Sequence, residues 1–442
     1  MDAELNVLEP HTPYDPSPPH VIVRGSGVRV WDDTGREFLD GVAGLWCVSL
    51  GYSQPRLVKA ATDQLERLPF YGSFSHRTND VALALAADLA VLAPMSSCRV
   101  FFANSGSEAN DSAIKLAWYY QTARGERDRT VILSHEGGYH GSTAAAASAT
   151  GMPHMHGGFG PLPLSMFERL ANPDPQGPLA AGASTAEFEE RLLAEAEKTI
   201  LRIGPDRVAA MIAEPVLGAG GLIIPPARYL RRLRELLHKY GILLILDEVI
   251  TAFGRTGRMF GSQHFNVEPD IVTVAKGLSS GYLPISAVLV SDQVCAAIDD
   301  ASRQRGTLGH GFTYSGHPVS AAVARETLRI LTGQDVPRHV RDVAGPALAR
   351  GVADLADAPG VRGVRSLGLL AAVDLETTGK AGEAGRHAAA EAVDHGLIVR
   401  PIGDTLIFAP PLVSTPEELS EMTERLDTTL NRRSVAVGGG AR

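Results

Sequence analysis

One of the six lysines in this sequence stands where an amine could do chemistry. Lys276 follows the apolar run 271–274 and precedes a glycine-rich turn at 277–281. A lysine that is partly desolvated at the end of a buried strand has a lowered pKa, and its neutral amine can act as a nucleophile or a base. The other five lysines lie in amphipathic helical stretches or in a loop rich in glycine and threonine. Lys276 is therefore the candidate for a catalytic amine.

A carboxylate stands in a similar position at the end of another apolar run. Asp247 follows five consecutive aliphatic residues at 242–246. A buried charge without a partner is costly, so Asp247 needs a metal ion, a neighbouring arginine or the protonated ring nitrogen of a bound heterocycle. A dinucleotide ribose is a less favoured partner, because no G-x-G-x-x-G motif follows the first strand of this region.

Three further segments after apolar runs carry polar or aromatic groups. Ser105, Gly106 and Ser107 are expected at a helix N-terminus, where N–H groups and hydroxyls suit a phosphate dianion, although a plain N-terminal cap has the same sequence. Tyr139 lies in a glycine-rich segment and could approach a flat ring or face solvent. Glu214 could accept a hydrogen bond from a ligand hydroxyl or from a neighbouring side chain.

The elements that must position these residues are short apolar runs separated by helical stretches. Runs that are apolar on both faces are typical of a parallel or mostly parallel sheet covered by helices, the α/β class. Ligands bind beyond the carboxyl ends of strands in such sheets, so the sheet would bring the candidate residues together. The predicted strands are 99–102, 130–133, 209–212, 242–246 and 271–274, and residues 160–185 are expected to form a surface excursion.

The two ends of the chain differ from this central part. Segments 27–31 and 37–40 flank a turn sequence and predict a β-hairpin. From about residue 320, helices alternate with strand candidates at 369–373 and 405–408, which predicts a second, α+β domain. The outermost segments are expected to be an extended proline-rich lead-in at 9–19 and a frayed tail at 435–442.

Composition argues against several classes of protein. The 442 residues are 44% hydrophobic, which is typical of a globular chain of two or three domains, and a net charge of −9 argues against binding nucleic acid or anionic membranes. Three cysteines without a CxxC pair, no apolar signal segment and no membrane-length apolar run favour a soluble, cytoplasmic protein. The histidine pair His154 and His156 is expected to lie on the surface, and no metal site is expected.

A phosphate cradle, a stacking aromatic residue, a strand-end aspartate and a strand-end lysine together match what pyridoxal 5′-phosphate (PLP) requires. The sequence also resembles the class III, or ω-type, aminotransferases of PLP fold type I, in particular the ω-amino acid and amine:pyruvate group. The motifs that carry the resemblance are GLWCV at 44–48, NSGSEA at 104–109, GYHG at 138–141, DEV at 247–249, FGRTG at 253–257, KGLSSGYLP at 276–284 and GFTYSGHP at 311–318.

The resemblance implies a role for each matched residue. Lys276 would form a Schiff base with the cofactor and then act as general base and acid, Asp247 would pair with the pyridinium nitrogen, and Val249 would pack on the ring face opposite Tyr139. Family members are dimers with the active site at the interface. The other implied contacts are with the phosphate (Ser105, Gly106, Ser107 and Thr313 of the partner subunit), with the rest of the cofactor (His140, Glu214 and Phe312) and with substrate (Trp46, Phe74 and the carboxylate-binding Arg400).

The expected activity is transfer of an amino group from an ω-amino acid or amine to a keto acid by a ping-pong mechanism, and the resemblance favours pyruvate as acceptor. Decarboxylating transaminases, aminomutases, epimerases and 2-oxoglutarate-dependent aminotransferases stay open as alternatives, as does a cofactor-binding protein without turnover. Leu217 stands where close relatives often have glutamine, which leaves the donor open.

The expected assembly is a homodimer or a dimer of dimers. The expected domains are an N-terminal segment of the small domain at 1–65, a large PLP-binding domain with a mostly parallel sheet of the seven-stranded type at 66–318, and the C-terminal part of the small domain at 319–442.

Overall fold

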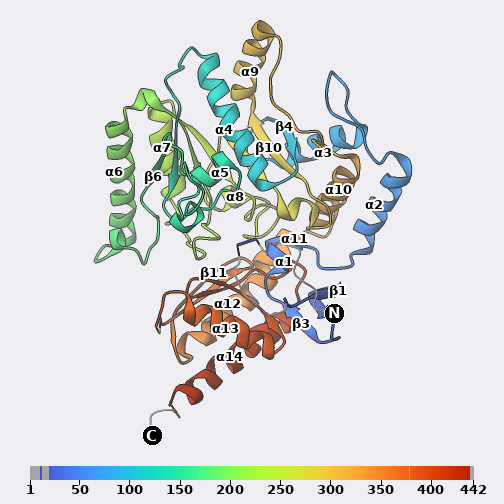
Figure 1. The fold of residues 1–442 in the computed structure, drawn as a ribbon, viewed down its shortest axis with the longest axis vertical. Helices are drawn as coiled ribbons and strands as arrows, with labels where there is room; N and C mark the ends of the chain where they lie inside the picture. The colour runs from blue at the N-terminus through green and yellow to red at the C-terminus, as the bar shows by residue number, and fades with distance from the viewer. Residues whose placement is uncertain (1–9, 12–18, 378, 439–442) are drawn as a thin grey trace.

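The structure is a computed structural model that describes residues 10–11, 19–377 and 379–438 (Figure 1). Most of the predicted lead-in at 9–19 lies outside the described residues, as do the last four residues of the predicted tail. The preceding part of that tail, residues 435–438, belongs to the last helix, α14 (Pro416–Gly438), and so differs from the expected frayed segment.

A seven-stranded sheet forms the centre of the larger part of the molecule, as the sequence predicts. Four of its six neighbouring strand pairs are parallel, and only β10 runs antiparallel to both of its neighbours. Its strands, in spatial order, are β4 (Cys98–Ala103), β10 (Ser286–Ser291), β9 (Ile271–Val274), β8 (Leu243–Asp247), β7 (Val208–Ala213), β5 (Val131–His135) and β6 (Phe167–Leu170).

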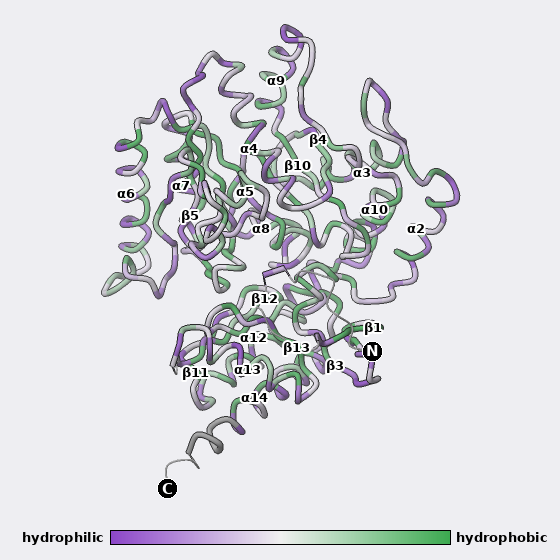
Figure 2. The backbone as a smooth tube through the Cα atoms, in the orientation of Figure 1, coloured by the Kyte–Doolittle hydropathy of each residue, from purple (hydrophilic) through white to green (hydrophobic). Residues whose placement is uncertain are grey.

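Alternate residues of the central strands face opposite layers of helices. In β8, Leu243 and Ile245 pack in a cluster with α4 (Gly106–Ala123) and α9 (Asp292–Arg305), whereas Leu244 and Leu246 pack with α6 (Thr185–Ile203) and α7 (Tyr229–Lys239). Successive side chains of a strand point to opposite faces, so a strand buried on both faces must be apolar throughout. Figure 2 shows α6 with alternating hydrophilic and hydrophobic bands, as expected for a helix with one buried face.

Two strands of this sheet were not expected from the sequence. β6 lies inside 160–185, so the prediction of a plain surface excursion there is wrong. The reason is that β6 is an edge strand whose middle residues, Glu168 and Arg169, are charged and only partly buried, so it lacks the apolar run of a central strand. β10 has a fully apolar centre, but it follows the turn after Lys276 so closely that the sequence pattern does not separate the two.

A smaller domain lies below this sheet in Figure 1 and contains both ends of the described chain. Its first sheet has the order β1 (Ile22–Ser26), β2 (Arg29–Asp32), β3 (Glu37–Asp40) and β13 (Leu397–Ile398), with β13 parallel to β3. Its second sheet is antiparallel, with the order β11 (Val361–Leu367), β12 (Leu370–Leu375), β15 (Thr405–Phe408) and β14 (Arg400–Ile402). The predicted hairpin and both predicted C-terminal strands are therefore present, while the domain boundaries at 66 and 318 stay a prediction.

The remaining helices cover these sheets or connect them. None of the helices among the described residues is long and apolar enough to cross a membrane. The helices are α1 (Ala43–Trp46), α2 (Pro55–Arg67), α3 (Asp80–Leu92), α5 (Ala144–Ala149), α8 (Gly261–His264), α10 (Pro318–Gly333), α11 (Val336–His339), α12 (Gly345–Ala353) and α13 (Glu383–Asp394).

Candidate active site

The candidate residues come together because they follow parallel strands. Asp247 ends β8, Glu214 follows β7 directly, and Lys276 is the second residue after β9. β4 and β9 both run antiparallel to the strand between them and are therefore parallel to each other, so Ser105 after β4 belongs to the same edge of the sheet. This edge is the carboxyl edge at which ligands bind in α/β sheets.

Asp247 is 4% exposed and is surrounded by hydrogen-bond donors. Its Oδ2 accepts hydrogen bonds from the Asn110 amide at 2.7 Å and from Nδ1 of His140 at 2.9 Å, and its Oδ1 accepts one from the backbone N–H of Val249 at 3.1 Å. A carboxylate only accepts hydrogen bonds, and these three donors satisfy it in that role. The position thus holds a buried negative charge that can pair with a cationic group of a ligand.

Sequence reasoning missed Asn110, which organises this group. Its amide also donates to the carbonyl of His140 at 2.6 Å, and its Oδ1 accepts a hydrogen bond from the Thr273 hydroxyl at 2.6 Å. The available signal was its place in α4, where a stripe at positions 110, 113, 114 and 117 faces the sheet and is otherwise apolar. A single amide on an apolar helix face requires buried hydrogen-bond partners.

Lys276 has the properties expected of a catalytic amine. Burial lowers the pKa of its ammonium, the charge of Arg400 acts in the same direction, and the charges of Asp247 and Glu214 oppose the shift. Its backbone has φ 38°, in the left-handed region that is rare for residues other than glycine. A backbone in this region carries strain, and such strain is concentrated at functional sites.

The N-terminus of α4 offers a cradle for an anion. Ser105 caps the helix by accepting a hydrogen bond from the Glu108 N–H at 3.2 Å, so the helix begins at Gly106 and its first N–H groups have no partner within the helix. A Cβ added to Gly106 would lie 3.2 Å from both methyl carbons of Val249. The serine hydroxyl of Ser107 accepts a hydrogen bond from the backbone N–H of Ser142 at 3.0 Å. Ser105, Gly106, Ser107 and Val249 therefore lie together, as the resemblance implies.

The segment after β5 is held against this cradle by Glu214. One oxygen of Glu214 accepts a hydrogen bond from the N–H of Tyr139 at 2.9 Å and the other from the N–H of Gly218 at 3.0 Å. Glu214 is 4% exposed, and burial raises its pKa to about 7; the charge of His140 lowers it and that of Asp247 raises it. The hydroxyl of Tyr139 lies 3.3 Å from that of Ser142. Glu214 therefore connects the Tyr139 segment with the glycine-rich loop after β7.

Two residues of the smaller part border the amine. The Trp46 ring centre is 5.8 Å from Nζ of Lys276, and its Nε1 is buried without a hydrogen-bond partner among the described residues. Trp46 also fills the space beside Gly218, where a Cβ would lie 2.3 Å from the indole ring. Arg400 begins β14, is partly buried, and has a lowered pKa because of that burial, an effect that the phenol of Tyr139 opposes. Trp46 and Arg400 are thus near the site, as expected.

Three predicted site residues make their described contacts elsewhere. Phe74 is 52% exposed, and a Cβ added to Gly311 would lie 3.2 Å from its ring. Phe312 packs edge-on against Phe101, with ring centres 6.3 Å apart, and Thr313 is exposed. Within one chain these residues belong to a surface loop, and the prediction that they complete a site across a dimer interface stays a prediction.

The residues present fit PLP. The fit rests on the buried carboxylate of Asp247, the desolvated amine of Lys276, and a helix N-terminus at Gly106 where an added Cβ would crowd Val249. These groups supply a partner for a protonated ring nitrogen, an amine for an aldehyde and N–H donors for a phosphate. Ser105, Gly106 and Ser107 would hold the phosphate, Tyr139 and Val249 would flank the ring, and Asp247 and Lys276 would hold its two reactive ends.

The fold and the site together define a PLP-dependent transaminase. The family model "Aminotransferase class-III" matches residues 12–430, and the chain belongs to this family. It is an enzyme of PLP fold type I that transfers an amino group from an ω-amino donor to a keto acid.

The relatives agree with this assignment. "Gamma-aminobutyrate transaminase 1, mitochondrial" of Oryza sativa subsp. japonica is 43% identical over 412 residues, which cover 91% of this chain and 80% of that protein. The omega transaminase of Pseudomonas jessenii in complex with PMP is 43% identical, with a TM-score of 0.93 over 96% of this chain and 94% of that one. A structure described as a transaminase with L-Ala is also 43% identical, with a TM-score of 0.92 over 94% of this chain and 100% of that one.

Proposed function

We propose that this aminotransferase takes the amino group of an ω-amino acid such as 4-aminobutyrate and gives it to pyruvate. The donor is supported by the names of relatives that are 43% identical, and the acceptor by the similar transaminase with L-Ala, since L-alanine is the product of pyruvate amination. The observation that carries the proposal is the desolvated amine of Lys276 beside the buried Asp247 and the partly buried Arg400. A cation whose charge acts on the reacting amine suits substrates that carry a carboxylate.

Lys276, Asp247 and Tyr139 are proposed as the catalytic residues. When bound, PLP supplies an electron sink for the carbon that loses a proton. The neutral amine of Lys276 would hold the cofactor covalently before the donor arrives, and its Nζ would afterwards remove the proton from the amine-bearing carbon of the donor and return it. Asp247, held in place by Asn110 and His140, would pair with the protonated ring nitrogen. Tyr139 would pack against the ring and fix its orientation.

Further residues would bind the substrates. Arg400 would pair with the carboxylate of the donor and then with that of the keto acid, because a planar guanidinium suits bidentate carboxylate recognition. Trp46 would form one wall of the pocket and offer its unpartnered Nε1–H to a substrate oxygen. One carboxylate site that serves both substrates in turn agrees with a ping-pong order, in which the first product leaves before the second substrate enters.

The test is a screen of amine donors with pyruvate, scored by alanine formation. We expect turnover with 4-aminobutyrate and with other ω-amino acids, and a more than thousandfold loss in Lys276→Ala. This variant should also lack the yellow colour of the wild type and the covalent attachment of the cofactor that borohydride reduction produces in the wild type. Lys115→Ala, which removes a surface amine, is the matched control and should keep both properties. Activity with 2-oxoglutarate alone would contradict the proposed acceptor and leave the cofactor chemistry intact.

We also propose that the enzyme works as a homodimer, alone or as a dimer of dimers. An exposed aromatic surface supports this: Phe70, Tyr71, Phe74 and Tyr314 are each more than 40% exposed, and the rings of Phe70 and Tyr314 lie 5.7 Å apart. Large exposed apolar groups that cluster are typical of protein interfaces. In this arrangement Phe312 and Thr313 of the neighbouring loop would reach the site of the other subunit.

Sedimentation of Tyr314→Ser tests the dimer. We expect the variant to shift toward monomer and to lose activity in proportion, with a control, Phe159→Ser, that removes an aromatic residue 66% exposed outside this cluster. A fully active monomer would contradict the proposal.

A cytoplasmic location is proposed as well. Cys47, Cys98 and Cys295 are all free thiols, as in proteins of reducing compartments. The rice relative is named as mitochondrial, so cell fractionation with an antibody against the protein is the test. Recovery only in an organelle fraction would contradict the proposal.

The proposed division into domains at residues 66 and 318 can be tested by limited proteolysis.

A further inference from the structure

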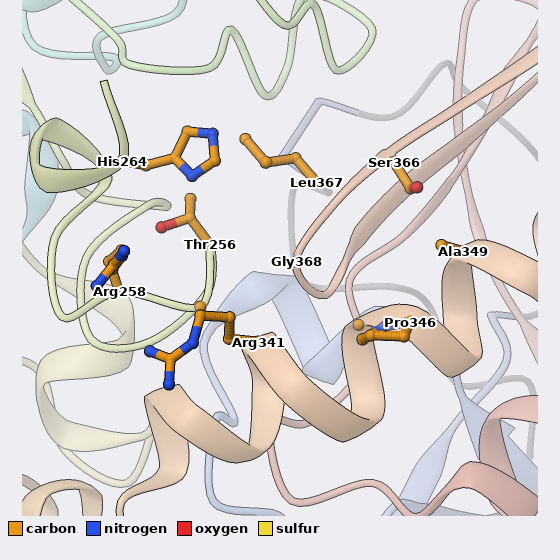
Figure 3. A pocket seen from close by; sticks show the side chains of 11 residues that line it. Thr256, Arg258, His264, Arg341, Pro346, Ala349, Ser366, Leu367 and Gly368 are labelled. Carbon is orange, nitrogen blue, oxygen red and sulfur yellow. The ribbon is translucent and has the colours of Figure 1, made fainter. Parts of the chain in front are cut away.

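A cavity separate from the candidate active site lies where the loop after β8 meets the smaller domain (Figure 3). Its volume is about 430 Å³, and it contains none of the residues proposed for the active site. Its walls come from the segment at 256–258, the end of α8, Arg341 and the first two turns of α12, and the end of β11 with the residue that follows it. The lining residues are Thr256, Gly257, Arg258, His264, Arg341, Gly345, Pro346, Ala349, Ser366, Leu367 and Gly368.

The rim of this cavity carries two arginines and a histidine, and one of the arginines has no matching anion. Arg258, His264 and Arg341 are exposed, and no aspartate or glutamate lines the cavity. Arg341 shares its charge with Asp342, at 2.9 Å, whereas Arg258 forms no ion pair with any residue that the structure describes. Partial burial lowers the pKa of His264, and the charge of Arg258 lowers it further. An uncompensated positive field at a concave site favours an anionic ligand.

The floor of the cavity contains a polar group without a partner. Thr256 is 5% exposed, and its Oγ1 makes no hydrogen bond to any described residue. Buried hydroxyls are nearly always hydrogen-bonded, because leaving one unpaired costs free energy. Thr256 is among the lining side chains drawn in Figure 3, and rotation of this side chain would let its hydroxyl, which is buried in this conformation, donate to a bound oxyanion.

One wall of the cavity is apolar and small. Pro346, Ala349 and Leu367 form it, and Gly257, Gly345 and Gly368 leave the floor without side chains. The space beside these glycines is limited by backbone, since a Cβ on Gly257 would lie 3.1 Å from Cα of Arg341. The site therefore suits a compact ligand with one charged end and a short carbon body.

We propose that this cavity is a second binding site for a small oxyanion, the carboxylate or phosphate group of a metabolite. Arg258 and Arg341 would pair with its oxygens and Thr256 would donate a hydrogen bond from the floor. Because the lining residues come from both the large sheet's loop and the smaller domain, a bound anion would hold these two parts together. Thr256 lies in the loop that follows β8, nine residues after Asp247. A ligand bound here would therefore contact the loop that begins at the active site without contacting the catalytic residues.

Calorimetric titration of the holoenzyme tests the proposal with two probes, inorganic phosphate and succinate, at constant ionic strength. We expect at least one probe to bind the wild type, and Arg258→Gln and Thr256→Val each to weaken that binding about tenfold or more, as loss of a charge-assisted or buried hydrogen bond would. The matched control is Arg350→Gln, which removes an exposed arginine of α12 that does not line the cavity. Its affinity should equal that of the wild type.

A variant that fills the cavity tests the same site without changing its charge. Ala349→Phe should abolish binding while the cofactor spectrum shows that the protein is folded. Binding of phosphate alone would identify a phosphate site, and binding of succinate alone a carboxylate site. The proposal is overturned if neither probe binds, if binding survives both Arg258→Gln and Ala349→Phe, or if it disappears only in Arg400→Gln, which would place it in the active site.

Discussion

Glu214 is a carboxyl group that the folded protein keeps protonated over a wider pH range than the unfolded chain does. Burial is the main cause, and it raises the pKa to about 7 from the ordinary value of 4.5. The folded state therefore binds this proton between about pH 4.5 and pH 7, whereas the unfolded state releases it. The stabilisation that this proton gives is fully present below pH 4.5 and is lost as the pH rises through 7. The free energy of unfolding falls by about 3 kcal/mol over this range.

The substitution Glu214→Gln removes this titration. We expect the variant to be less stable than the wild type at pH 5, because the amide cannot accept from both the Tyr139 and Gly218 N–H groups. Between pH 5 and pH 8, however, its free energy of unfolding should fall by about 3 kcal/mol less than that of the wild type. Urea unfolding of the apoenzyme at both pH values measures this, and parallel losses in the two proteins would contradict the assignment.

Asn110 provides the second prediction at the scale of single residues. Asn110→Ala removes one of the two side-chain donors to Asp247 and the contact to the His140 carbonyl. We expect kcat and the affinity for PLP to fall about tenfold, since the carboxylate loses a charge-assisted hydrogen bond of about 1.5 kcal/mol or more. Spectrophotometric titration with PLP and steady-state kinetics measure both.

Thr273→Val is the graded control for Asn110. It removes only the hydroxyl that orients the amide, so its effect should lie between wild type and Asn110→Ala. An Asn110→Ala enzyme with unchanged affinity for PLP would show that His140 alone suffices to hold Asp247.

At the scale of elements, the turn that brings the segment after β5 to the start of α4 depends on Gly141. This residue has φ 133°, and a Cβ there would lie 2.4 Å from Oγ of Ser107. Gly141→Ala should therefore displace Ser107 and weaken PLP binding at least tenfold, as seen by absorbance titration. Gly125→Ala, at another positive φ of 85° with no atom within 4 Å of the added carbon, carries the backbone strain without the collision. Equal affinities of the two variants would contradict the proposed role of this turn.

The elements also show what the sequence could predict and what it could not. Strands such as β8 are predictable because burial on both faces demands an uninterrupted apolar run, and Asp247 and Lys276 stand out as polar groups at the ends of such runs. β6 cannot be predicted in this way, because an edge strand needs no uninterrupted apolar run. Asn110 cannot be predicted from the sequence, because its contacts depend on how α4 packs against the sheet. The roles of Phe74 and Thr313 stay a prediction, because they rest on the proposed second subunit.

At the scale of the whole molecule, Arg255 joins the two parts of the structure. It is 1% exposed and lies in the loop after β8, and it donates hydrogen bonds to the carbonyls of Leu369 and Pro410 in the smaller domain. Burial lowers its pKa to about 10, and the neighbouring Cys47 thiol opposes this shift. The guanidinium thus replaces water as the partner of two carbonyls where the parts meet.

Arg255→Met should weaken this junction. We expect the free energy of unfolding to fall by about 2–4 kcal/mol, because two buried carbonyls lose their donor while the side chain keeps its approximate volume. Urea unfolding of the holoenzyme measures the change, and Arg350→Gln, the exposed arginine of α12, should change it by less than about 0.5 kcal/mol. A loss as small as that of the control would show that Arg255 is replaceable.

The parallel pairing of Leu39 in β3 with Leu397 in β13 also has a consequence for the synthesis of the chain. During translation β3 is made early and β13 only after the large sheet, whose seven strands are all complete at Ser291. Contacts between such distant segments form slowly, and an unpaired strand edge is prone to association while it waits. The large sheet can therefore assemble before the smaller domain is complete, and this later step is where chaperones would matter most for the yield of active enzyme.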